Sequence, residues 1–237
     1  MRLLVSVRGP VEARAAVLGG ADVIDAKDPD RGALGAVRAD RLAAIRREVG
    51  AARPVSAALG DVRDDAMVAA AAAAAPGLAF VKLGFAGVTG EAQAQRLARA
   101  ARGAVPAATR MVLVAYADWR RAGSLAPARL VAVAAETGAA GLLLDTAWKD
   151  APLFALESPH AVAAWVDAAR AAGLFAALAG SLSGGDFATA RAVGAELVGV
   201  RGAACIGGRR GRVSRARVAA LQRLVRAAPA LPLGALP

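Results

Sequence analysis

Residues 2–27 read RLLVSVRGPVEARAAVLGGADVIDAK. Two short apolar runs, 2–7 and 22–27, enclose an alanine- and arginine-rich stretch that has the pattern of a helix and closes on two glycines, as helices often do. A strand, a helix and a second strand in this order predict a βα unit whose two strands lie parallel in one sheet.

The same alternation continues along the chain, so that eight strand-like runs can be counted in all. They are RLLVSV (2–7), DVIDAK (22–27), PVSAAL (54–59), AFVKLG (79–84), RMVLVAYA (110–117), GLLLDTA (141–147), LFAALAGS (174–181) and ELVGVRG (196–202). Their apolar character suits strands that are covered on both faces. Eight units closing on themselves predict an α/β fold, the parallel (β/α)8 TIM barrel, for which 237 residues are enough. We expect one domain over residues 1–230 and a flexible tail, LPLGALP (231–237).

The composition indicates a protein of the cytoplasm without membrane partners. Of the 57% hydrophobic residues most are alanine, and the longest such stretch, AMVAAAAAAAPG (66–77), is too short to span a bilayer. The first residues, MRLLVSVRGP (1–10), lack the long apolar run of a signal peptide. A single cysteine, Cys205, can form no intramolecular disulfide and has no partners for a structural zinc site, so we expect it to serve packing and expect no metal.

The net charge of +11 raises nucleic acid as an alternative partner, above all through GGRRGRVSRAR (207–217). Aromatic residues make up only 4% of the chain, which leaves few platforms for stacking bases, and no nucleic-acid-binding motif is present. The arginines are also spread over many segments. We therefore favour an arginine-rich surface that attracts anionic substrates, and expect no nucleic acid; a basic nucleic-acid-binding protein stays the alternative of a different class.

Lysine is almost absent from this basic chain. Of 30 basic residues only 3 are lysines, Lys27, Lys82 and Lys149. Arginine serves as an ordinary surface charge throughout, but it cannot lose its proton at workable pH and attack a carbonyl, as a neutral lysine can. Each lysine lies at or just after the end of a strand-like run, where TIM barrels carry their active sites. The three amines are therefore predicted to meet at one mouth of the barrel.

Two carboxylates accompany these lysines. Asp25 lies two residues before Lys27 and so shares its face of the strand, whereas Asp145 ends a run four residues before Lys149. Each pair, taken alone, is compatible with a structural salt bridge. Clustered amines and burial together favour a neutral lysine, which a nucleophile or base requires, so we predict a catalytic set of all five residues.

Glycine-rich segments end the last two runs, LAGSLSGGD (178–186) and VGVRGAACIGG (198–208). Barrels of this type often bind phosphate after strands seven and eight, through backbone N–H groups. Gly180, Ser181, Arg201 and Gly202 are the predicted phosphate ligands, against the alternative that these are ordinary loop glycines.

Three further residues have weaker signals. His160 follows Ser158 and Pro159, which have the pattern of a helix start, so we expect it on the surface. Tyr116 and Asp118 close the fifth run and would line the mouth or, in the case of the tyrosine, pack in the core. The chain has neither a Walker loop nor a GxGxxG after its first strand, so we expect no nucleotide cofactor and no other cofactor.

Together, the strand-end motifs resemble those of the (5-formylfuran-3-yl)methyl phosphate synthase family. The matching segments run from the first strand to the eighth: GGADVIDAKDPDRGALGA (19–36), VSAALGDV (55–62), FVKLGFAGV (80–88), LLLDTAWKDA (142–151), LAGSL (178–182) and LVGVRGAACIGG (197–208). A set of this extent is far more specific than any one motif.

The resemblance implies a lyase of methanofuran biosynthesis that condenses two molecules of glyceraldehyde 3-phosphate into a furan phosphate. It makes Lys27 the Schiff-base lysine and Lys82 a proton acceptor, and it matches Asp25, Asp145 and Lys149 to further active-site residues. A different Schiff-base aldolase acting on a phosphorylated sugar would have similar pocket chemistry and is the nearest alternative. The expected partner is the small triose phosphate, and a homo-oligomer is compatible with the sequence.

Overall fold

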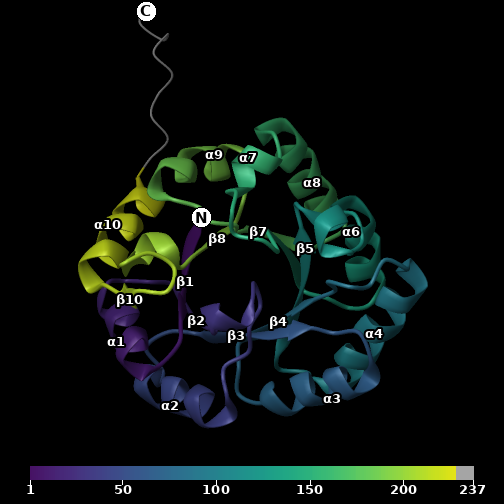
Figure 1. Cartoon of the computed structure of the whole chain (residues 1–237), viewed down its shortest axis with the longest axis horizontal. Helices are drawn as coiled ribbons and strands as arrows, with labels where there is room; N and C mark the ends of the chain where they lie inside the picture. Colours follow the sequence, from purple (N-terminus) through teal and green to yellow (C-terminus); the bar gives the residue numbers. More distant parts are fainter. Residues whose placement is uncertain (228–237) are drawn as a thin grey trace, which may run out of the picture.

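Eight strands follow one another around a closed barrel, each in parallel with its neighbour (Figure 1). They are β1 (Arg2–Val7), β2 (Val23–Ala26), β3 (Val55–Asp61), β4 (Phe80–Gly84), β5 (Arg110–Tyr116), β6 (Gly141–Asp145), β7 (Phe175–Leu178) and β8 (Leu197–Val200), which pairs back with β1. The structure, a computed structural model, describes residues 1–227. The predicted TIM barrel is confirmed. The predicted domain limit at residue 230 and the tail 231–237 lie outside the described residues.

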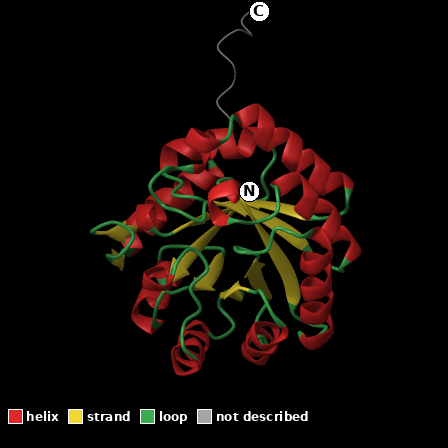
Figure 2. Cartoon of the chain, turned by 45° about the vertical axis from the view of Figure 1, so that its right-hand side comes forward, coloured by secondary structure: helices red, strands yellow, loops and turns green. Residues whose placement is uncertain are grey.

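The helices surround the strands, as Figure 2 shows. The longer ones are α1 (Pro10–Leu18), α2 (Ala39–Val49), α3 (Asp65–Ala74), α4 (Glu91–Ala104), α6 (Pro127–Glu136), α8 (Pro159–Ala171), α9 (Phe187–Ala192) and α10 (Arg215–Arg226); α5 (Trp119–Ala122) and α7 (Leu153–Leu156) are single turns. Capping residues explain the starts of two helices. Asp64 accepts a hydrogen bond from the N–H of Met67 at the start of α3, and Ser158 caps α8. His160, in the first turn of α8, is exposed as predicted. Within residues 1–227 no helix is both long and apolar enough to cross a membrane.

Apolar side chains form two layers because successive residues of a strand point to opposite faces. The outer layer packs the strands against the helices and contains Leu3, Val5 and the predicted packing residue Cys205. The inner layer fills the barrel and contains Leu4, Phe80, Leu143 and Leu197. Two residues farther along the same strands come Ser6, Lys82 and Asp145, so the inward-facing series changes from apolar to polar toward the carboxyl ends.

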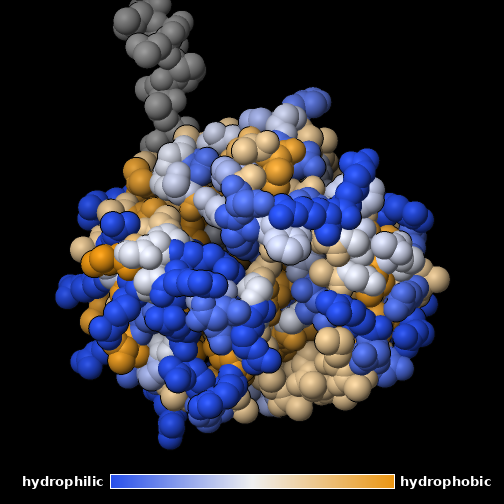
Figure 3. All heavy atoms as spheres, in the orientation of Figure 1, coloured by the Kyte–Doolittle hydropathy of each residue, from blue (hydrophilic) through white to orange (hydrophobic). Residues whose placement is uncertain are grey.

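Two loops cover part of the mouth. After β2 the chain forms the short 3₁₀ helix η1 (Pro29–Arg31), and Leu34 beyond it is buried in the inner layer. After β8 the chain forms a hairpin of β9 (Cys205–Ile206) and β10 (Arg212–Val213), which the sequence did not predict. The hairpin divides the basic stretch 207–217, because Arg209 lines the barrel pocket whereas Arg210 pairs with Asp30 of η1. Hydrophilic side chains gather over much of the face of the molecule that Figure 3 shows.

Candidate active site

A cavity of about 290 Å³ lies inside the barrel and opens at the carboxyl ends of the strands. Its wall contains all three lysines, whereas its deeper part is lined by the inner apolar layer, including Leu4, Phe80 and Leu143. The volume is at the lower end of the range of ligand pockets, about 300–1,000 Å³. The cavity therefore suits a small, partly polar substrate.

Asp25 is fully buried and accepts three hydrogen bonds. The hydroxyls of Ser6 and Ser56 donate from 2.8 Å each, and Nζ of Lys82 donates from 2.6 Å. The register explains the contacts, because Asp25 lies between Ser6 of β1 and Ser56 of β3. The sequence suggested a pair of Asp25 with Lys27; in the structure Asp25 instead forms its salt bridge with Lys82.

Lys27 follows β2 directly, and its backbone N–H donates to the carbonyl of Val7. Only 8% of the residue is exposed, yet its amine forms no hydrogen bond or ion pair within residues 1–227, in contrast to the two other lysines. The pKa of Lys27 is lowered to about 7, chiefly by burial; the negative charge of Asp145 opposes this shift, the positive charges of Lys149 and Lys82 add to it, and the negative charge of Asp25 opposes it more weakly. Near neutral pH Lys27 is thus a substantially neutral amine.

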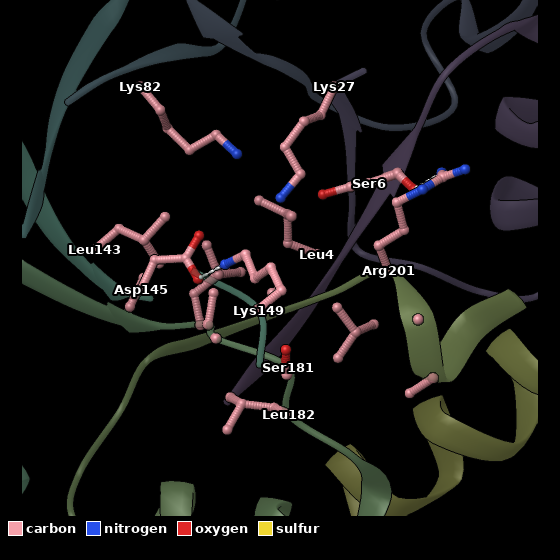
Figure 4. A pocket seen from close by; sticks show the side chains of 18 of the residues that line it. Leu4, Ser6, Lys27, Lys82, Leu143, Asp145, Lys149, Ser181, Leu182 and Arg201 are labelled. Atoms are coloured by element: carbon pink, nitrogen blue, oxygen red, sulfur yellow. Dashed lines mark hydrogen bonds and ion pairs between the residues drawn. The ribbon is translucent and has the colours of Figure 1, made fainter. Parts of the chain in front are cut away.

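Asp145 and Lys149 form a second salt bridge, in which Nζ donates to Oδ1 from 2.6 Å. Nζ also donates to the carbonyl of Thr146 from 2.5 Å, and the N–H of Thr146 donates to the carboxylate. Burial by itself raises the pKa of Asp145, but the charges of Lys149 and Lys27 and these hydrogen bonds outweigh it, so that the pKa is lowered. Figure 4 shows the amines of the three lysines pointing toward one common space.

The predicted phosphate loops lie beside this space. Gly180, Ser181 and Gly202 line the cavity, and the N–H groups of Ser181, Leu182, Gly202 and Ala203 donate to no other backbone group of the described chain. Gly180 has φ +99° and a Cβ there would lie 2.9 Å from Thr146, so only glycine fits. Ser181 has φ 54°, a conformation that is costly for serine and that clusters at functional sites.

Arg201 also lines the cavity, but its guanidinium is held by other groups of the protein. Its guanidinium donates all five N–H groups within the protein: to the carboxylate of Glu12 and to the backbone carbonyls of Ser6, Arg209 and Gly211. Figure 4 shows it pointing away from the space between the lysines. This geometry counts against Arg201 as a direct phosphate ligand and makes it an anchor that ties β8 and the hairpin to α1.

Comparison with known proteins identifies the family. The model of the 4-HFC-P synthase family matches residues 3–222. The chain belongs to the 4-HFC-P synthase family. It is 43% identical to the (5-formylfuran-3-yl)methyl phosphate synthase of Methanopyrus kandleri, over 89% of this chain and 92% of that protein. It is 39% identical to the enzyme of the same name from Methanocaldococcus jannaschii, over 94% and 99% of the two chains. Membership in this family of synthases makes the chain an enzyme.

Solved structures that resemble this 4-HFC-P synthase family member are other barrel proteins. The 3-hexulose-6-phosphate synthase of Salmonella typhimurium aligns with a TM-score of 0.62 at 20% identity, over 95% of this chain and 100% of that one. The phosphoribosyl anthranilate isomerase of Thermus thermophilus aligns with a TM-score of 0.62 at 16% identity, over 95% and 98%. At such identities the likeness concerns the fold alone.

Sequence reasoning missed several residues that support the site of this 4-HFC-P synthase family member. Ser6 and Ser56 could have been noticed as lone hydroxyls within apolar strands, which are the usual partners of a buried carboxylate. Asp118, expected to line the mouth, instead accepts the N–H groups of Ala147 and Trp148 and so fixes the turn that carries Lys149. Tyr116 is buried and donates to Asp61; burial, together with that carboxylate, raises its pKa well above the usual value.

Proposed function

We propose that this protein is a carbon–oxygen lyase acting on phosphates, which condenses two molecules of glyceraldehyde 3-phosphate into (5-formylfuran-3-yl)methyl phosphate through a lysine Schiff base. Its place would be the biosynthesis of a methanofuran-type cofactor. The names of the relatives support the product. The observation that carries the mechanism is Lys27, a buried amine that has no partner among residues 1–227 and a pKa lowered to about 7.

The first step is attack of neutral Lys27 on the aldehyde of one triose phosphate, followed by loss of water to give an iminium ion. The cationic nitrogen withdraws electrons from the bond to the adjacent carbon, so the proton on that carbon becomes acidic. Lys82 first passes its extra proton to Asp25, to which it is hydrogen-bonded at 2.6 Å, and then removes the acidic proton from the substrate as a neutral amine. Asp25 also orients the amine of Lys82.

Removal of the proton gives an enamine, and the next carbon of this triose bears the phosphate ester, so β-elimination expels inorganic phosphate and leaves an unsaturated iminium ion. The second triose, deprotonated at the carbon next to its aldehyde, attacks the terminal carbon of this ion and forms the carbon–carbon bond. The hydroxyl oxygen of the first triose then closes the ring on the aldehyde of the second, loss of two molecules of water gives the furan, and hydrolysis of the imine frees Lys27. Lys149, held by Asp145 at the rim of the cavity, offsets the negative charge that develops on oxygen during these steps.

The free N–H groups at Ser181, Leu182, Gly202 and Ala203 would hold a substrate phosphate, with Gly180 allowing the loop to approach it. Phosphate binding at this position is frequent in TIM barrels. Arg201 would act here indirectly, by fixing the loop after β8.

Incubation of the purified protein with glyceraldehyde 3-phosphate tests the product. A furan aldehyde absorbs in the ultraviolet and is identified by mass spectrometry, with release of inorganic phosphate in equal amount. A phosphorylated sugar without this absorption would instead identify a different Schiff-base aldolase.

Borohydride reduction tests the imine. Substrate and reductant together should inactivate the enzyme and add mass to the peptide that contains Lys27, whereas protein without substrate stays unmodified. Lys27→Arg should be inactive and unlabelled, because arginine stays protonated, but Lys82→Ala should still be labelled. Labelling of Lys82 or Lys149 in place of Lys27 would overturn the assigned roles.

A further inference from the structure

The cavity contains five basic residues, and three of them are neutralised by a carboxylate. Lys82 pairs with Asp25, Lys149 with Asp145 and Arg201 with Glu12. Among the described residues that line the cavity, Lys27 and Arg209 are the basic groups without a carboxylate partner. Lys27 is about half neutral at pH 7, whereas Arg209 stays charged, so Arg209 is the cation whose full charge is left for a ligand.

Arg209 extends from the hairpin after β8 to the loop after β2. Its backbone nitrogen lies 3.7 Å from where a Cβ of Gly202 would be. Its guanidinium donates to the carbonyls of Pro29, from 2.9 Å, and Gly32, from 2.8 Å. The side chain thus crosses the mouth to the loop that follows Lys27, while the free amides of Ser181 and Gly202 belong to the loops after β7 and β8.

The guanidinium keeps hydrogen-bonding capacity in this position. Two of the N–H groups are used by the two carbonyls, and a guanidinium has five in all. The nearby carboxylate Asp30 is already held by Arg210 at 3.1 Å and by Arg8 at 3.8 Å. Arg209 is half-buried, and this burial lowers its pKa because it disfavours the charged guanidinium. An anion bound in the cavity would stabilise that charge.

We infer that Arg209 binds a phosphate group of the substrate, at a position separate from the loop amides after β7 and β8. The inference rests on the proposed function, in which two triose phosphates enter the cavity and bring two phosphate groups. One would lie on the amides and the other on Arg209, close to the carbon chain attached to Lys27. The planar guanidinium can donate two parallel hydrogen bonds to a phosphate, which a lysine cannot.

Calorimetric titration of the purified protein with glycerol 3-phosphate, which has no aldehyde and cannot react, tests the inference. Arg209→Met should weaken binding about tenfold to hundredfold, the loss expected for a charge-assisted pair of hydrogen bonds. Arg210→Met is the matched control: it removes the same charge from the same hairpin, but its side chain is exposed and pairs with Asp30. We expect near-normal binding in that variant.

Equal affinity in the wild type and Arg209→Met, equal losses in both variants, or no binding by the wild type would each overturn the inference. Because Arg209→Met also loses two hydrogen bonds to the β2 loop, the same samples are compared in borohydride trapping with glyceraldehyde and with glyceraldehyde 3-phosphate. If Arg209 binds phosphate, Arg209→Met should lower trapping of glyceraldehyde 3-phosphate and leave trapping of glyceraldehyde unchanged. Equal losses with the two aldehydes would show that the loop is disturbed and would overturn the phosphate-binding role of Arg209. Furan formation is assayed separately, so that its absence, with binding still dependent on Arg209, would refute the proposed function alone.

Discussion

The acid–base state of Lys27 can be measured directly by competitive labelling with trace acetic anhydride, which acylates only neutral amines. The chain has three lysines, all in separate peptides of the cavity wall, so mass spectrometry reads each one individually. With a pKa of about 7, the neutral fraction of Lys27 is about one-half at pH 7 and about one-tenth at pH 6. An exposed lysine is neutral at pH 7 in only about one molecule in three thousand. The labelling of Lys27 should therefore rise with a midpoint near pH 7.

Two substitutions should move this midpoint in opposite directions. Lys149→Met removes a positive charge that lowers the pKa of Lys27, so the midpoint should rise. Asp145→Asn removes the negative charge that raises it most, so the midpoint should fall. Asp40→Asn, on an exposed carboxylate that is paired with Arg38 and does not line the cavity, is the control and should leave the midpoint unchanged.

The size of the pKa shift of Lys27 follows chiefly from its burial. A shift from 10.5 to about 7 corresponds to about 5 kcal/mol of disfavour for the charged amine in the folded protein. A wild-type midpoint above about pH 9, close to that of an exposed lysine, would refute the reasoning. A shift of both variants in the same direction would contradict the assignment of the charges.

Three further outcomes follow from the same contacts. Lys27→Met should raise the free energy of unfolding by up to about 5 kcal/mol at pH 6, because it removes an amine that is charged more readily in the unfolded than in the folded protein. Since the folded pKa of Lys27 lies below the unfolded value, this gain in stability should fade as pH rises from 7 toward 10.5, which denaturant titrations measure. Arg201→Ala leaves the buried Glu12 with Arg8 as its remaining cationic partner, at 3.5 Å, and should cost up to about 3–5 kcal/mol of unfolding free energy; an unchanged melting temperature would contradict the anchoring role of Arg201. Asp118→Ala frees the turn before Lys149 and should lower kcat about tenfold, with partial recovery in Asp118→Asn; equal kcat in all three proteins would exclude this positioning role.

The barrel and the set of lysines and aspartates around its mouth could be predicted from local sequence patterns. Strand-like runs of six to eight mostly apolar residues alternate with helical patterns, and this local periodicity depends only on which residues neighbour one another in the chain. The rarity of lysine was also visible in the sequence and pointed to special roles for the three lysines, because arginine serves wherever charge alone is needed. Lys27, Lys82 and Lys149 were thereby predicted to share one cavity, and they do.

Which charges pair depends on how the chain folds in three dimensions. Asp25 and Lys27 are two residues apart, yet Asp25 bonds to Lys82, which is 57 residues away, because the barrel register places Ser6, Ser56 and Lys82 around the carboxylate. The same holds for Arg201. Its sequence position predicted a phosphate ligand, but its guanidinium donates to the carboxylate of Glu12, which is 189 residues away. Hydrogen-bond partners in a closed barrel are set by strand register and by how loops cross the mouth, and neither is encoded in local sequence spacing. Within residues 1–227 Lys27 thus remains unpaired for a reason that lies in the fold: Asp25, the partner expected for it, is already occupied by Ser6, Ser56 and Lys82.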